Sequence, residues 1–203
     1  MAFARIYETD TCTAYAGDTR SLKLSFAVWV IDEYTGQKPS GKIRVEIKET
    51  GKKASQNLSG YYFFTDLHAE GSYTLSIKSE LYFPEEITVD MSAFSDPKKP
   101  VIEINGKPEI ALKPNPGYPF SGNATLLRGQ IESSSGKPVA GLRVGVDGKN
   151  IENLTDSRGE FVLYFKNIIK SEEVTLIING EAVENSFTVR EGKTVSAKKI
   201  SIQ

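Results

Sequence analysis

The residue types that support catalysis are scarce in this sequence. Acyl transfer by serine or cysteine needs a general base, usually a histidine that a third group positions. The only histidine is His68, and its surroundings, TDLHAEGSY, are typical of an exposed turn before a strand. A zinc site needs three or four ligands, and one histidine with one cysteine, Cys12, cannot supply them. We therefore expect no enzyme, no metal site and no cofactor.

Aromatic residues are the better candidates for a functional surface. Successive side chains of a strand point to opposite faces, so if Tyr62 and Phe64 point inward, Tyr61 and Phe63 point outward. Trp29 is likewise expected on the outward face, because its two neighbours in the chain are inward valines. Large outward aromatics can mark a binding surface. The sequence therefore predicts a binding surface at Trp29, Tyr61 and Phe63.

Composition limits the classes of binding partner that we expect. The 203 residues include 25 basic and 26 acidic side chains, a net charge of -1, so no global field attracts nucleic acid or anionic lipid. The longest apolar run near the N-terminus, Phe26 to Ile31, is too short for a signal core or a membrane span. We expect protein partners or self-association, with glycan as the alternative, no nucleic acid and no membrane. The expected location is the cytoplasm or a particle assembled there.

The elements that would position the aromatic residues come in two copies. The segment IDEYTGQKPSGKIRVEI, residues 31–47, matches IESSSGKPVAGLRVGV, residues 131–146. The aligned pairs include Ile31 with Ile131, Val45 with Val144 and Gly60 with Gly159. This pattern predicts a tandem duplication of a unit of domain size.

Each copy has the period of a half-buried strand. Ile43, Val45 and Ile47 alternate with Arg44 and Glu46, which predicts antiparallel sheets with one apolar face. In the second copy we expect seven strands, near 126–132, 142–147, 151–154, 160–166, 173–178, 184–189 and 194–202. This spacing favours an all-β fold of two tandem Greek-key β-sandwiches.

The stretch between the copies holds six of the nine prolines. Proline removes a backbone donor and restricts φ, so this stretch is not interior sheet throughout. VIEI, residues 101–104, is expected to be the last strand of the first domain, and KPNPGYPF, residues 113–120, a stiff linker. The predicted divisions are a first domain at 1–112, a linker at 113–124 and a second domain at 125–203.

The run GKPVAGLRVGV followed by TDSRGEFVLYF resembles the carboxypeptidase regulatory-like domain, a transthyretin-like (prealbumin-like) β-sandwich. The resemblance covers Leu126 to Gln203 well and Phe26 to Ile104 more weakly, because NLSG replaces the TDxxG turn there. It implies an accessory module, since such domains are appended to peptidases, adhesins, transporters and phage-like particles.

The TDSRGEF segment has a structural interpretation without chemistry. We expect Asp156 to cap its own turn, Gly159 to adopt a positive φ and Phe161 to point inward. The alternative is a weak cation site at Asp156 and Glu160, although the clustered oxygen ligands that calcium requires are missing.

A second, shorter resemblance concerns LKPNPGYPFSGNATLLRGQI, residues 112–131, which is similar to small accessory proteins of contractile injection systems, the phage-tail-like particles. It implies a non-enzymatic structural component of such a particle. The alternative function is a carbohydrate-binding or adhesin-type module that uses Trp29, Tyr61 and Phe63 as stacking platforms. We further expect the first copy to be the interaction domain, and residues 1–25 or the linker to cover its aromatic surface.

Overall fold

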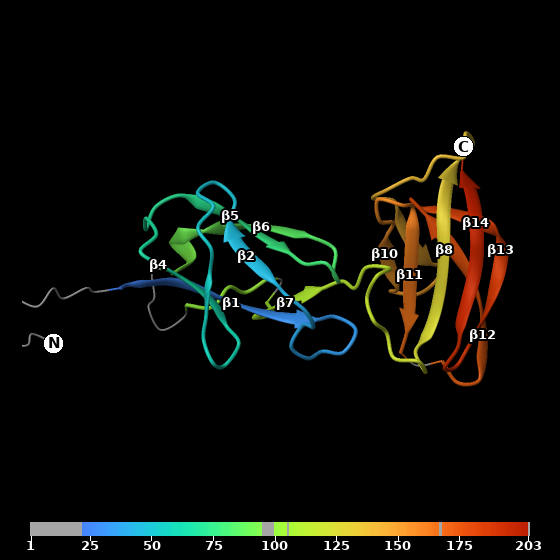
Figure 1. The fold of residues 1–203 in the computed structure, drawn as a ribbon, viewed down its shortest axis with the longest axis horizontal. Helices are drawn as coiled ribbons and strands as arrows, with labels where there is room; N and C mark the ends of the chain where they lie inside the picture. The colour runs from blue at the N-terminus through green and yellow to red at the C-terminus, as the bar shows by residue number, and fades with distance from the viewer. Residues whose placement is uncertain (1–21, 95–99, 105, 167, 203) are drawn as a thin grey trace, which may run out of the picture.

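The computed structural model describes residues 22–94, 100–104, 106–166 and 168–202. The expectation for Cys12, and that for a cover formed by residues 1–21, lie outside these ranges. Nearly all regular secondary structure of the described residues is β-strand, and no helix among them is long and apolar enough to cross a membrane. The strands form two bodies that lie side by side (Figure 1), here called the first and the second sandwich.

The first sandwich has two sheets around one core. Its elements are β1 (Leu24–Asp32), β2 (Arg44–Ile47), β3 (Ser55–Gln56), β4 (Tyr62–Thr65), β5 (Ser72–Lys78), β6 (Glu85–Asp90), the 3-10 helix η1 (Met91–Phe94) and β7 (Glu109–Leu112). One sheet has the order β3-β4-β1-β7 and the other β2-β5-β6. Phe26 and Val28 of β1 face Ile47, Leu75 and Ile77 of the other sheet in the core.

The second sandwich has the same strand order except at its third strand. Its strands are β8 (Thr125–Ser133), β9 (Arg143–Val146), β10 (Glu152–Leu154), β11 (Glu160–Phe165), β12 (Ser171–Ile178), β13 (Glu181–Arg190) and β14 (Thr194–Ile202). The sheets are β11-β8-β14 and β10-β9-β12-β13. Its third strand, β10, pairs with β9, whereas β3 pairs with β4. In both sandwiches the first strand lies between the fourth, antiparallel, and the last, parallel. Because these neighbours are distant in sequence, the chain between them crosses from one sheet to the other.

The seven strands predicted from the second copy all form, but the last strand of the first copy was misplaced. The parallel partner of β1 is β7 and not VIEI, of which Val101 forms an isolated bridge with Ala27. The reason is that Ile110 and Leu112 fill the core from β7, whereas the VIEI segment makes only isolated bridges, the second of them between Ile104 and Lys107.

The pairing register also corrects the sequence alignment by one residue. Val30 and Ile131 are both buried, at 3% and 0% exposure, whereas Ile31 is half-buried on the outer face. The loop after β1 is one residue longer, because Asp32 N donates to Gln37 O, while Ser133 N donates to Lys137 O. Val30, rather than Ile31, therefore occupies the position of Ile131. The duplication itself, and the boundaries at 112 and 124, stay predictions.

Candidate binding surface

The three predicted surface residues lie on one face of the first sandwich. Phe63 of β4 is directly opposite Ala27 of β1. Tyr61, the residue before β4, contacts Trp29 of β1, with ring centroids 4.6 Å apart. All three side chains are half-buried. Gly60, at φ +94°, places its backbone under the indole, since a Cβ there would lie 3.5 Å from Trp29 Cζ3. We call Trp29, Tyr61 and Phe63 the aromatic surface.

The inward partners of these residues lie where the alternation predicted. Phe64 is 1% exposed in the first core, and Tyr62 packs against that core. In the second sandwich Phe161, Leu163 and Phe165 are all core residues. The prediction of two faces is confirmed for both strands.

The same face of the second sandwich is covered. Val162 and Leu126 point outward from β11 and β8, yet they are 0% and 3% exposed. They pack in one cluster with Tyr164, Tyr34 and Phe120, which joins the two sandwiches. The first sandwich and the chain that follows it therefore cover this face of the second sandwich. We call this contact between the two sandwiches the inner junction.

Aromatic rings and one carboxylate form the centre of the inner junction. The Tyr34 and Phe120 rings lie 5.4 and 5.8 Å from the ring of Tyr164. Tyr164 Oη donates to Glu33 Oε1 at 2.8 Å, and Lys166 Nζ donates to the Glu33 carbonyl at 2.8 Å. Burial, and then the adjacent Glu33 carboxylate, raise the pKa of Tyr164.

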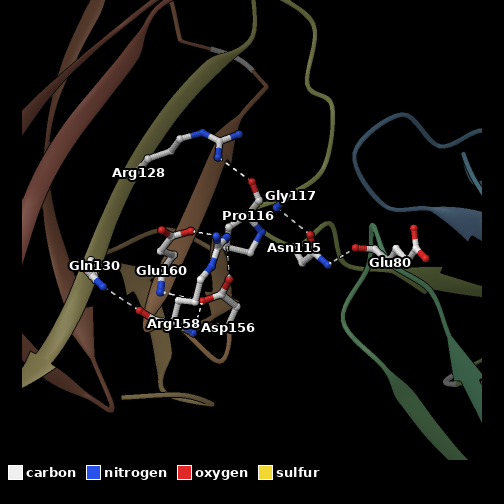
Figure 2. A network of polar contacts seen from close by, with 9 residues as sticks. All are labelled: Glu80, Asn115, Pro116, Gly117, Arg128, Gln130, Asp156, Arg158 and Glu160. Atoms are coloured by element: carbon white, nitrogen blue, oxygen red, sulfur yellow. Dashed lines mark hydrogen bonds and ion pairs between the residues drawn. The ribbon is translucent and has the colours of Figure 1, made fainter. Parts of the chain in front are cut away.

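The proline-rich segment, residues 113–120, is held to both sandwiches by polar contacts (Figure 2). On the side of the first sandwich, Asn115 Nδ2 donates to Glu80 O at 2.8 Å. On the other side, Arg128 Nη1 donates to Pro116 O at 2.8 Å, and the buried Asn153 Nδ2 donates to Pro114 O at 2.8 Å. The segment is therefore a packed connector rather than a free tether.

A buried carboxylate ties the connector to the first sandwich. Asp32, 1% exposed at the end of β1, accepts hydrogen bonds from Tyr82 Oη and Tyr118 Oη. Its second oxygen accepts from the backbone N–H of Tyr34 and of Thr35. The loop that carries Tyr34 and the connector that carries Tyr118 thus share one anchor.

The TDSRGEF segment adopts the predicted turn (Figure 2). Asp156 Oδ1 accepts from Arg158 N and Glu160 N at 2.8 and 2.9 Å. Gly159 has φ +71° and Phe161 is 1% exposed. The Arg158 guanidinium lies 2.7 Å from Glu160 and 3.5 Å from Asp156, so an internal cation already occupies the position considered for a metal.

The described residues offer little chemistry beyond these contacts. His68 is exposed in an irregular segment, as predicted. Within the described ranges no group of three or more His, Cys, Asp or Glu side chains could hold a metal ion. A groove of about 600 Å³ runs along the inner junction, between Glu33 and Lys113 on one side and Tyr164 and Lys166 on the other. A second groove, of about 870 Å³, opens between β13 and β14.

Sequence reasoning missed the inner junction. The outward residues of β11, Val162 and Tyr164, are apolar and aromatic, whereas the outward residues of a solvent-exposed strand are polar. This difference was the sequence signal that the outward face of β11 is covered. The signal does not say which surface covers them, because Tyr34 and Phe120 come from distant parts of the chain.

No protein-family model matches the chain, and no curated protein matches it. Among solved structures, the chain is similar to the Bacillus anthracis TIE protein at 8% identity and a TM-score of 0.29, over 81% of this chain and 33% of the other. It is also similar to a streptococcal ancillary pilin at 10% identity and a TM-score of 0.28, over 89% and 69%. The chain thus spans about a third of the TIE protein.

Proposed function

We propose that this protein is a non-enzymatic structural protein that binds another protein through its aromatic surface. The observation that carries the proposal is the difference between the two equivalent faces. On the second sandwich the face is buried by protein, with Val162 at 0% exposure, whereas at the equivalent position of the first sandwich Phe63 is half-buried beside Trp29 and Tyr61. Burying large apolar side chains favours association, at about 1.5–3 kcal/mol each when burial is complete.

The geometry of the rings favours a protein over a glycan. The Trp29 and Tyr61 planes are tilted by 48°, so the two rings present no common flat platform for a sugar. Tilted rings with grooves between them suit interdigitating side chains, as at the inner junction, where Tyr34 meets Tyr164 at 75°.

Within this function we propose two tandem carboxypeptidase regulatory-like domains in a component of a larger assembly, such as a phage-tail-like contractile particle assembled in the cytoplasm. The packed connector supports this role, because Asn115 and Arg128 hold it from opposite sides. A spacer between partners must keep its ends in a constant orientation.

The test combines capture from native lysate with the fluorescence of the chain's single tryptophan, Trp29. We expect the tagged wild type to retain a protein partner that the Tyr61→Ser/Phe63→Ser variant loses, and the isolated partner to shift wild-type Trp29 emission to shorter wavelength. Leu58→Ser is the matched control, since Leu58 is fully exposed in the adjacent turn. Recovery of the wild type without any surface-dependent partner contradicts the proposal. Glycan-array binding that Trp29→Ala abolishes would instead support the carbohydrate-binding alternative.

A further inference from the structure

The chain enters and leaves each sandwich at opposite ends of two parallel neighbouring strands. In the first sandwich it enters at Leu24, the start of β1, and leaves at Leu112, the end of β7. In the second it enters at Thr125, the start of β8, and leaves at Ile202, the end of β14 (Figure 1). Tension along the chain therefore pulls the two strands of each pair in opposite directions along their own axes.

This direction of pulling loads each strand pair in shear. The hydrogen bonds of a parallel pair are evenly spaced along the strands, so they share a force along the strand axis and must break together. A force across the strands at one end would instead break the bonds one after another. Breaking many bonds in one step raises the barrier to unfolding, and forced unfolding is governed by the unfolding rate. The same ladder therefore resists shear more strongly than peeling.

The ladder of the second sandwich is the longer one. β8 and β14 form eight residue pairs, whereas β1 and β7 form four. Ala197, Ile200 and Ile202 of β14 pack on the second core, and a shift of β14 by one residue would exchange its two faces. β14 therefore cannot slide along β8 without turning these apolar side chains outward.

The connector joins the two ladders without a loose tether. Tyr118 Oη donates to the carboxylate of Asp32, at the end of β1. Asn153 Nδ2, from β10, donates to Pro114 O at 2.8 Å. The segment between β7 and β8 is thus fixed to both sandwiches, so tension acts on folded contacts over the whole path from β1 to β14.

We infer that this protein carries mechanical tension along its chain, with the β8–β14 ladder as its strongest element and the β1–β7 ladder as the weaker one. The inference goes beyond the proposed function, because it concerns the first and last strands of each sandwich and not the aromatic surface. A structural protein in a larger assembly is pulled when its neighbours move apart, and ladders loaded in shear keep it folded under that force.

Single-molecule force spectroscopy on the full chain tests the inference. One handle is attached at Cys12, the single cysteine of the sequence, and the other at Gln203→Cys, so that both ladders are sheared. We expect two unfolding events, with the larger force for the second sandwich. The released length identifies each event, because about 90 residues unravel from the first sandwich and about 80 from the second, at about 3.3–3.6 Å per residue.

The matched control pulls the second sandwich from one end. Ser121→Cys/Lys193→Cys, combined with Cys12→Ser, places both handles at exposed positions near the start of β8, because Leu126 N donates to Lys193 O at 3.0 Å. This geometry peels the sandwich, and we expect an unfolding force lower than the shear force by about twofold or more at the same pulling speed. Circular dichroism with thermal melting verifies that each variant is folded.

Two outcomes overturn the inference. One is an equal unfolding force of the second sandwich in the two geometries, and the other is a second sandwich that unfolds at lower force than the first. Either result leaves the proposed function intact if lysate capture still depends on Tyr61 and Phe63.

Discussion

At the scale of single residues, both the backbone conformation and the close packing at position 159 require glycine. The φ of Gly159, +71°, is a left-handed conformation, and a Cβ there would lie 2.4 Å from Ile131 O. Gly148 has nearly the same φ, +68°, but a Cβ at that residue would meet no atom within 4 Å. The two glycines therefore separate the cost of conformation from the cost of a clash.

We predict that Gly159→Ala lowers the free energy of unfolding by more than Gly148→Ala does. A left-handed alanine costs about 1–2 kcal/mol at either site, and the clash at Gly159 adds about 1–3 kcal/mol. Urea unfolding of both variants measures the difference. Equal losses at the two sites would show that the turn moves away from β8 without cost.

The buried tyrosines predict a loss of stability at alkaline pH. Burial, and then the hydrogen bond to Asp32, raise the pKa of Tyr118, and burial with Glu33 raises that of Tyr164. A group whose pKa is higher in the folded chain binds its proton more tightly there. Its contribution is thus complete below the unfolded pKa of about 10 and is lost as pH rises through the folded pKa.

We expect the free energy of unfolding to fall above pH 10, by up to about 1.4 kcal/mol per pH unit for each such tyrosine. Tyr118→Phe and Tyr164→Phe should each make the fall shallower, while at pH 7 they lose about 1 kcal/mol with the hydrogen bond. Urea unfolding between pH 7 and 11 measures both effects. A fall as steep in both variants as in the wild type contradicts the assignment.

At the scale of elements, Asn153 connects three pieces of backbone. From β10 its Nδ2 donates to Val162 O of β11 at 3.0 Å and to Pro114 O of the connector at 2.8 Å. It is 1% exposed, so water does not compensate these carbonyls if the amide is removed. Asn153 thus links the two sheets of the second sandwich to the inner junction.

We predict that Asn153→Ala lowers the free energy of unfolding by about 1–3 kcal/mol, the cost of leaving buried partners unsatisfied. Asn150→Ala, an exposed position near the same strand, is the matched control and should change stability little. Chemical denaturation measures both. A loss no larger than that of the control would mean that the two carbonyls find other donors.

At the scale of the whole molecule, the connector determines the relative orientation of the two sandwiches. Figure 1 shows β1 directed toward the second sandwich, and β8 running across that direction. Tyr118 is buried in the first core, and Phe120 contacts both the first core and the junction cluster. The orientation therefore depends on side-chain packing as well as on proline stiffness.

We expect one orientation to account for the small-angle X-ray scattering of the wild type. Tyr118→Ser/Phe120→Ser should require a broader distribution of orientations and a larger maximum dimension, because both anchors are lost while all connector prolines remain. Pro119→Ala is the control for stiffness, since Pro119 is exposed. Unchanged scattering in the double variant would show that the prolines and the polar contacts suffice.

The sequence by itself determined the class of fold and most strand positions. Period-two alternation is local, so Val45 and Ile47, which alternate with Arg44 and Glu46, identify their own inward face without knowledge of their partners. The turn at Asp156 and Gly159 was equally predictable, because side-chain capping and positive φ depend on neighbours in the chain.

Tertiary structure decided register and coverage. The register of β1 against β4 depends on hydrogen bonds between distant segments, and a shift of one residue exchanges the two faces. The sequence alignment does not contain this register. It therefore paired Ile31 with Ile131, although Val30 is the buried counterpart. Coverage of an outward face depends on which remote surface meets it. Tyr34 covers Tyr164 from a distant part of the sequence, whereas Trp29 and Phe63 stay half-buried. The strand pattern of the sequence cannot distinguish these two cases, because the burial of an outward side chain depends on which remote surface packs against it.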